Sequence, residues 1–77
     1  MKYIMFDYGD RLDIPIVFPD YIKHKDIANL FENKGLKAVS AGFCIKEGKT
    51  FGESHSLKLS PRAEDENILK FFFRHVR

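Results

Sequence analysis

The sequence has one cysteine, Cys44, among its 77 residues. An intramolecular disulfide needs two thiols, so the bridged frameworks of small secreted domains are excluded. This absence favours a reducing compartment, and we expect a cytoplasmic protein. The three histidines and Cys44 also lack the paired spacing of zinc ligands. Because no glycine-rich phosphate loop precedes a predicted helix either, we expect neither a metal nor a cofactor.

Long apolar runs are missing as well. No stretch approaches the roughly 20 apolar residues that cross a bilayer, so no membrane association is expected. The opening residues lack the basic-then-apolar pattern of a signal peptide, since Asp7 and Asp10 interrupt the apolar run, and export is not expected.

The sequence also lacks a large excess of positive or negative charge. Thirteen Lys and Arg oppose eleven Asp and Glu, which leaves a formal net charge of +2. The basic residues are scattered rather than gathered in one block, and this argues against a dedicated electrostatic clamp for nucleic acid.

What the sequence does contain is enough apolar material for one core. Hydrophobic residues make up 44% of it, and eight of them are phenylalanine. A chain of this length has too little apolar surface to build two cores, so residues 1–77 are predicted to form a single domain.

The first half predicts two strands and a helix. Residues 2–8 are rich in aromatic and β-branched types, and residues 12–18 alternate apolar and polar positions. The odd loop 9–11 would place the apolar side chains of both strands on one face. Pro15 predicts an edge strand, because proline donates no ladder hydrogen bond. Apolar spacing then predicts a helix over 24–34, ended by Gly35.

The second half repeats the order. Residues 36–46 and 50–59 are predicted to form a hairpin around Gly48, which suits a left-handed loop position. Ser60 followed by Pro61 is a typical helix start, with a side-chain cap and a proline at the first helical position. The predicted fold is therefore α+β, in the order ββαββα: a four-stranded, mainly antiparallel sheet with both helices packed on one face.

This arrangement leaves the second face of the sheet open, and strand parity puts small residues on it. A small domain gains much from extra burial, so we expect this face to bind a protein partner or a second copy of the chain as a homodimer, with an ordinary solvated sheet face as the alternative interpretation. The expected contact residues are Ser40, Gly42, Gly52, Ser54 and Ser56.

Two other clusters could carry a function. Glu53 and His55 would point the same way from one strand and could share a proton, although a solvated pair at the hairpin end is the simpler interpretation. Alternation would send the neighbouring serines to the opposite face, so no nucleophilic triad is predicted. On the last helix, Lys70, Arg74 and Arg77 form a basic stripe that could contact nucleic-acid phosphates, or simply form a solvated outer face.

Three segments together resemble a group of short bacterial and prophage proteins without an assigned activity. They are residues 39–43 (Val-Ser-Ala-Gly-Phe), residues 52–57 (Gly-Glu-Ser-His-Ser-Leu) and residues 60–65 (Ser-Pro-Arg-Ala-Glu-Asp). The resemblance spans most of the chain and implies no chemistry. Since no catalytic set is evident, we expect a small non-enzymatic protein-binding or regulatory domain, associated with phage, with nucleic-acid binding by the last helix as the alternative.

Overall fold

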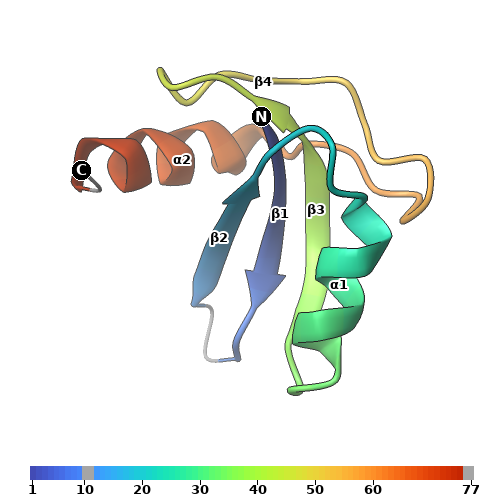
Figure 1. The fold of residues 1–77 in the computed structure, drawn as a ribbon. Coiled ribbons are helices and arrows are strands. Elements are labelled where there is room, and N and C mark those ends of the chain that lie inside the picture. Colours follow the sequence, from blue (N-terminus) through green and yellow to red (C-terminus); the bar gives the residue numbers. More distant parts are fainter. Residues whose placement is uncertain (10–11, 76–77) are drawn as a thin grey trace.

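The computed structural model describes residues 1–9 and 12–75, and Asp10 and Arg11 of the first predicted loop lie outside them. The elements follow the predicted order of strand, strand, helix, strand, strand, helix (Figure 1). They are β1 (Lys2–Asp7), β2 (Asp13–Phe18), α1 (His24–Glu32), β3 (Lys37–Cys44), β4 (Thr50–Phe51) and α2 (Ala63–His75). No helix in the described part is long and apolar enough to cross a membrane.

The strands form one antiparallel sheet in the order β2-β1-β3-β4. The α+β prediction is therefore confirmed. Ile4 lies opposite Ile16 and Phe6 lies opposite Ile14, as the predicted parity of the first hairpin requires. Pro15 lies in β2 at the edge of the sheet, where its missing N–H costs no internal ladder bond.

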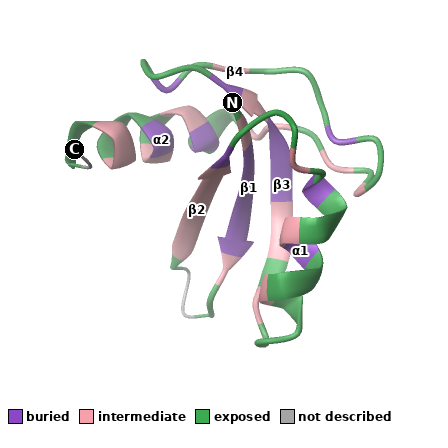
Figure 2. Cartoon of the chain, viewed as in Figure 1, coloured by how far each residue is buried: buried purple, intermediate pink, exposed green. Residues whose placement is uncertain are grey.

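The central strand β1 is buried on both sides (Figure 2). Tyr3, Ile4, Met5 and Phe6 are all fully buried. Because successive side chains of a strand point to opposite faces, β1 contributes to two separate cores. Ile4 and Phe6 belong to one core, and Tyr3 and Met5 belong to the other.

Each of these cores is covered by a different helix, so the prediction that both helices pack on one face is wrong. Ala28 and Phe31 of α1 pack in the Ile4 core. Leu69 and Phe73 of α2 pack in the Tyr3 core. Figure 1 shows the two helices on opposite sides of the sheet. The uninterrupted apolar run of β1 requires this cover, because a strand that is apolar on both faces needs an element on each.

A bulge in the pairing of β1 with β3 interrupts the alternation of side chains along β3. Met5 pairs with Ser40 whereas Phe6 pairs with Ala38, so Val39 is the extra residue. Val39 consequently packs in the core under α2, and Ala38 packs in the core under α1. Strict alternation along β3 would instead place Val39 on the side of α1 and Ala38 on the side of α2.

The helices are shorter than their patterns predicted. Helix α1 ends at Glu32, and Gly35 follows with a left-handed φ of 88°, as expected for a residue that closes a helix. Helix α2 begins at Ala63, so the Ser60–Pro61 start is wrong by two residues. Arg62 precedes this helix, and its backbone N–H donates to the carboxylate of Asp65, which satisfies one of the free N–H groups at the helix start.

The last predicted strand is mostly absent. Strand β4 comprises only Thr50 and Phe51, and the chain then forms a loop, residues 52–62, that contains one isolated bridge between Ser54 and Leu59. The hairpin turn itself is as predicted, with Gly48 at a φ of 91°. A Cβ at Gly48 would lie 2.8 Å from the backbone nitrogen of Lys70, so the turn also requires glycine for close contact with α2.

Candidate functional site

The predicted partner-binding face is inside the protein. Ser40 is 0% exposed and Ser54 is 2% exposed, and Gly42 is buried as well. A Cβ at Gly42 would lie 2.9 Å from the side chain of Pro61, so the chain leading into α2 lies directly against it. Of the five predicted contact residues, only Gly52 and Ser56 are exposed. The expectation of an open sheet face is therefore wrong, because it depended on both helices lying on the other side.

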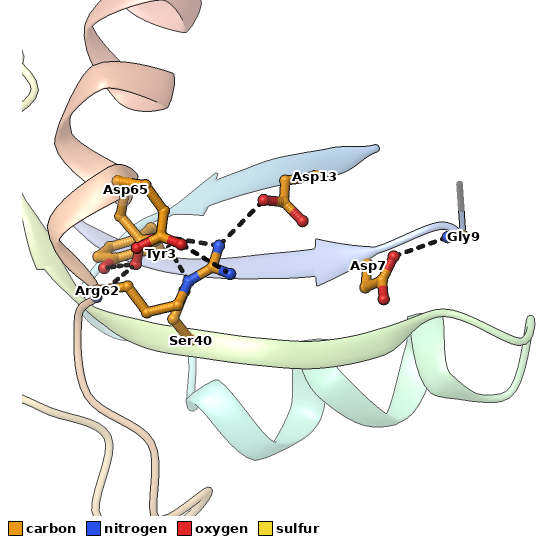
Figure 3. A network of polar contacts seen from close by, with 8 residues as sticks. Tyr3, Asp7, Gly9, Asp13, Ser40, Arg62 and Asp65 are labelled. Carbon is orange, nitrogen blue, oxygen red and sulfur yellow. Dashed lines mark hydrogen bonds and ion pairs between the residues drawn. The ribbon is translucent and has the colours of Figure 1, made fainter. Parts of the chain in front are cut away.

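A network of polar side chains covers this face (Figure 3). The Asp65 carboxylate is its centre and is fully buried. The Tyr3 hydroxyl donates to Oδ2 of Asp65 over 2.7 Å, and Nε of Arg62 donates to Oδ1 over 3.0 Å. The Arg62 guanidinium also donates to Ser40 and to Asp13, over 3.2 Å in each case. We call these five residues the Arg62 network.

The electrostatics of the Arg62 network indicate a structural role. Burial, and the hydrogen bond and charge of Asp65, raise the pKa of Tyr3 far above its ordinary value, so this hydroxyl remains protonated. Burial lowers the pKa of Arg62, but the Asp65 and Asp13 carboxylates outweigh burial and raise it. All buried polar side-chain atoms in the described residues have hydrogen-bond partners. The network is thus fully occupied with holding the start of α2 on the sheet.

Glu53 and His55 lie near each other, but both side chains are exposed to solvent. Nε2 of His55 is 3.6 Å from Oε1 of Glu53, and the two side chains are 89% and 57% exposed, respectively. This matches the simpler interpretation of a solvated pair. Their segment is a loop rather than a strand, so Ser56 lines the same pocket as the pair, against the prediction from alternation. No hydrogen bond joins Ser56 to His55 within the described ranges.

A pocket with a volume of about 700 Å³ lies beside this pair. Its walls come from four separate segments: the start of β1, residues 23–25 at the start of α1, the end of β3 and the loop after β4. We call it the basic pocket. It is lined by Lys2, Lys23, His24, Lys25, Phe43, Gly52, Glu53, His55 and Ser56.

Three ammonium groups and one carboxylate lie around the basic pocket. Nζ of Lys2 donates to the backbone oxygen of Ile22 over 2.9 Å, which fixes it at the pocket wall. Lys23, immediately before α1, and Lys25, in its first turn, are exposed, and the helix start has no side-chain cap. Glu53 is the acidic residue of the lining. The positive charge here is therefore not neutralised by the pocket's own residues.

His24 anchors the basic pocket to the sheet. It is 5% exposed, and its Nε2 lies 2.9 Å from the backbone oxygen of Gly42, so the proton is assigned to Nε2. Burial lowers its pKa and the Lys2 charge lowers it further, while the carbonyls of Gly42 and Tyr3 act in the opposite direction. The imidazole is consequently neutral near pH 7, and the positive charge of the pocket comes from the lysines.

The basic stripe of α2 is only partly described. Lys70 and Arg74 are exposed, and Arg77 lies outside the described residues. Glu66 lies one turn before Lys70 and accepts a hydrogen bond from the backbone N–H of Thr50 over 2.9 Å. This bond, together with the charges of Lys70 and Lys49, lowers the pKa of Glu66. A carboxylate therefore accompanies the stripe.

Other reactive groups do not form a site. Cys44 is buried, and burial raises the pKa of its thiol, which keeps it protonated and inert. Residues 1–9 and 12–75 contain no cluster of three potential metal ligands. A second pocket, of about 560 Å³, is mainly apolar and is lined by Tyr8, Leu30, Phe31, Lys34 and Leu36.

Sequence reasoning missed the basic pocket. The run Lys23-His24-Lys25 was a visible signal, because it places two charges around a histidine at a helix start. Lys2 and the loop after β4 join it only through the tertiary fold. Comparisons with protein-family models, with curated proteins and with solved structures found no match.

Proposed function

We propose that this chain is a small, non-enzymatic protein-binding domain that docks an acidic segment of a partner protein in the basic pocket. The supporting observation is the uncompensated charge of the lining, where Lys2, Lys23 and Lys25 face a single carboxylate, Glu53. The proposal keeps the expected class of function and moves it from the buried sheet face to a surface that a partner can reach.

A contrast with Arg62 supports this location, together with the gathering of three lysines around one pocket. Arg62 is paired with Asp13, Glu64 and Asp65, whose oxygens lie within 3.7 Å of it. The three pocket lysines, like the other lysines, form no ion pair with the described residues, but they lie around one pocket. Like charges in a cluster repel one another, so a bound acidic ligand lowers the electrostatic energy of this site.

The chemistry of the lining also favours binding over catalysis. A nucleophile needs a base within hydrogen-bond reach, and Ser56 has no such contact with His55 among the described residues. The His55–Glu53 pair is strongly exposed, so water rather than the protein surrounds both groups. An exposed carboxylate, imidazole and hydroxyl at the pocket rim fit polar contacts with a partner.

Hexaglutamate is a suitable first probe, followed by ¹H–¹⁵N NMR at low salt. The expected shifts cluster at Lys2, at residues 23–25 and at residues 52–56. Binding should weaken steeply with added salt, because it depends on exposed charges. The variant K23E/K25E should lose most of the affinity, and it should fold normally, because acidic residues suit the start of a helix.

The matched control is K34E/K37E, which makes the same change of charge at two exposed lysines outside the basic pocket. This control should retain most of the binding. Equal loss in both variants would mean that hexaglutamate responds only to net charge and would overturn the proposal. Absence of binding to the wild-type protein would do the same.

The alternative, nucleic-acid binding by the α2 stripe, makes a different prediction. It requires that single-stranded DNA or RNA binds the wild-type protein and that K70E/R74E abolishes this binding, while K23E/K25E retains it. Lys70 and Arg74 are both exposed, so these changes leave the core intact.

A further inference from the structure

We infer that the acidic group held in the basic pocket is a phosphate ester on a side chain of the partner, rather than a carboxylate. The inference rests on the proposed function and specifies its ligand. Charge balance, the arrangement of the donors and the apolar wall of the pocket each support it.

Charge balance comes first. Three ammonium groups and the Glu53 carboxylate give the lining two uncompensated positive charges, with His24 neutral. A phosphate monoester carries about −1.5 to −2 at pH 7, whereas a carboxylate carries a single negative charge. The phosphate ester therefore matches the uncompensated charge of the pocket, whereas one carboxylate would neutralise only about half of that charge.

The donors come from two elements. Lys2 reaches the pocket from β1, and its ammonium keeps N–H groups beyond the one given to the Ile22 carbonyl. Lys23, immediately before α1, and Lys25, in its first turn, flank the buried His24 in the sequence and line the same pocket. Ammonium groups from separate segments around one pocket can contact different oxygens of a phosphate, which has three strong acceptor oxygens, whereas a carboxylate has two.

His24 positions these lysines. Its Nε2 donates to the Gly42 carbonyl on β3, and its ring lies edge-on to Phe43, with centroids 5.7 Å apart. These contacts fix the first turn of α1 against the sheet. The helix start itself has no side-chain cap, so its positive end adds to the attraction for an anion.

An apolar wall lies next to the charged groups. Phe43 lines the pocket and is held by stacking on Phe51, with centroids 5.5 Å apart. Gly52 keeps this wall accessible, because a Cβ there would lie 2.8 Å from the Phe43 ring. A phosphorylated side chain has an apolar stem between its backbone and its phosphate, and this wall offers the stem a contact.

Three peptides of the form Glu-Glu-Xaa-Glu-Glu test the inference, where Xaa is phosphoserine, glutamate or serine. Affinities are measured by calorimetry, and NMR shifts locate the bound peptide. We expect the phosphoserine peptide to bind about tenfold more tightly than the glutamate peptide, through its additional charge and charge-assisted hydrogen bonds. In K23E/K25E this preference should disappear, whereas K34E/K37E should keep it.

The outcomes separate the two proposals. Equal binding of the phosphoserine and glutamate peptides in the pocket would overturn the phosphate inference and leave the proposed function standing. Binding of none of the three peptides would overturn the proposed function itself. Inorganic phosphate serves as the final probe. If it binds as tightly as the phosphoserine peptide, the peptide contributes nothing, and the assignment to a phosphorylated protein is overturned.

Discussion

The two charged clusters of this domain lie on opposite faces of the sheet, and they differ in how their charges are satisfied. In the Arg62 network every buried polar atom has a partner from the same chain. In the basic pocket the lysines face one carboxylate between them. The contrast begins at neighbouring residues of β1, because Lys2 belongs to the pocket and Tyr3 belongs to the network.

Under the proposed function, this difference separates polar groups that hold the fold together from polar groups that bind a partner. Removing one partner of a buried, fully paired charge is strongly destabilising, and such a charge has no free hydrogen-bonding group for a ligand. An exposed group of like charges contributes little to stability and remains available. Substitutions in the Arg62 network should therefore change stability and not binding, and substitutions in the pocket should do the reverse.

The largest expected effect comes from Asp65→Ala. The substitution leaves the Tyr3 hydroxyl and part of the Arg62 guanidinium without their partner, at a cost of about 3 kcal/mol in unfolding free energy. Urea denaturation followed by circular dichroism measures it. The control Glu64→Ala removes a neighbouring carboxylate that is 61% exposed, and it should cost less than about 0.5 kcal/mol. Similar losses in the two variants would contradict the structural role of the network.

Gly42→Ala should have the next largest effect. Its Cβ would lie 2.9 Å from Cγ of Pro61 and 3.1 Å from the backbone oxygen of Phe51, and backbone must move to admit it. Overpacking of this kind costs about 1–3 kcal/mol. Urea denaturation measures this effect as well. The variant Ala63→Gly, measured in the same way, shows the effect of weakening the start of α2 alone. An unchanged midpoint for Gly42→Ala would mean that the chain before α2 does not press on the sheet.

Tyr3→Phe should cost about 1–2 kcal/mol, because it removes one hydrogen bond to a buried carboxylate and keeps the ring. It also has a pH signature. Since the folded pKa of Tyr3 lies above its ordinary value of 10.0, the folded state holds a proton that the unfolded state loses. Wild-type stability should therefore fall as pH rises above 10.0, by up to about 1.4 kcal/mol per pH unit. Tyr3→Phe should show a shallower alkaline decline, and parallel curves for the two proteins would contradict the assignment.

Glu53→Gln should have the smallest effect on stability, within about 0.5 kcal/mol, because the residue is exposed. Its effect on binding should be opposite to that of the lysine variants. Removing the carboxylate of the pocket should strengthen hexaglutamate binding by roughly two- to threefold at low salt, and the gain should vanish at high salt. Weaker binding would place Glu53 among the groups that hold the peptide.

The sequence predicted much of the fold from local patterns. Alternation in residues 12–18, the proline of the edge strand and the glycines after α1 and in the second hairpin all lie where expected. The candidate site was not predicted from local patterns. Its lysines come from β1 and α1, and the loop after β4 completes it, so no single stretch of sequence contains its pattern.

The error about the open face has one physical source. Strand parity assigns side chains to faces, but it does not say which face a later helix will cover. The apolar residues of β1 on both faces carried that information, and the bulge at Val39 then exchanged two side chains between the faces. The small Gly42 permits close packing of Pro61, in the chain that leads into α2, on the sheet.

The sequence by itself determined the class of fold, the order of the elements and the edge position of β2, because these depend on local periodicity and on the backbone limits of proline and glycine. Only the tertiary structure decided which charges are neutralised and which remain open. That decision depends on distances between residues far apart in the chain, such as the 2.7 Å from the hydroxyl of Tyr3 to the carboxylate of Asp65.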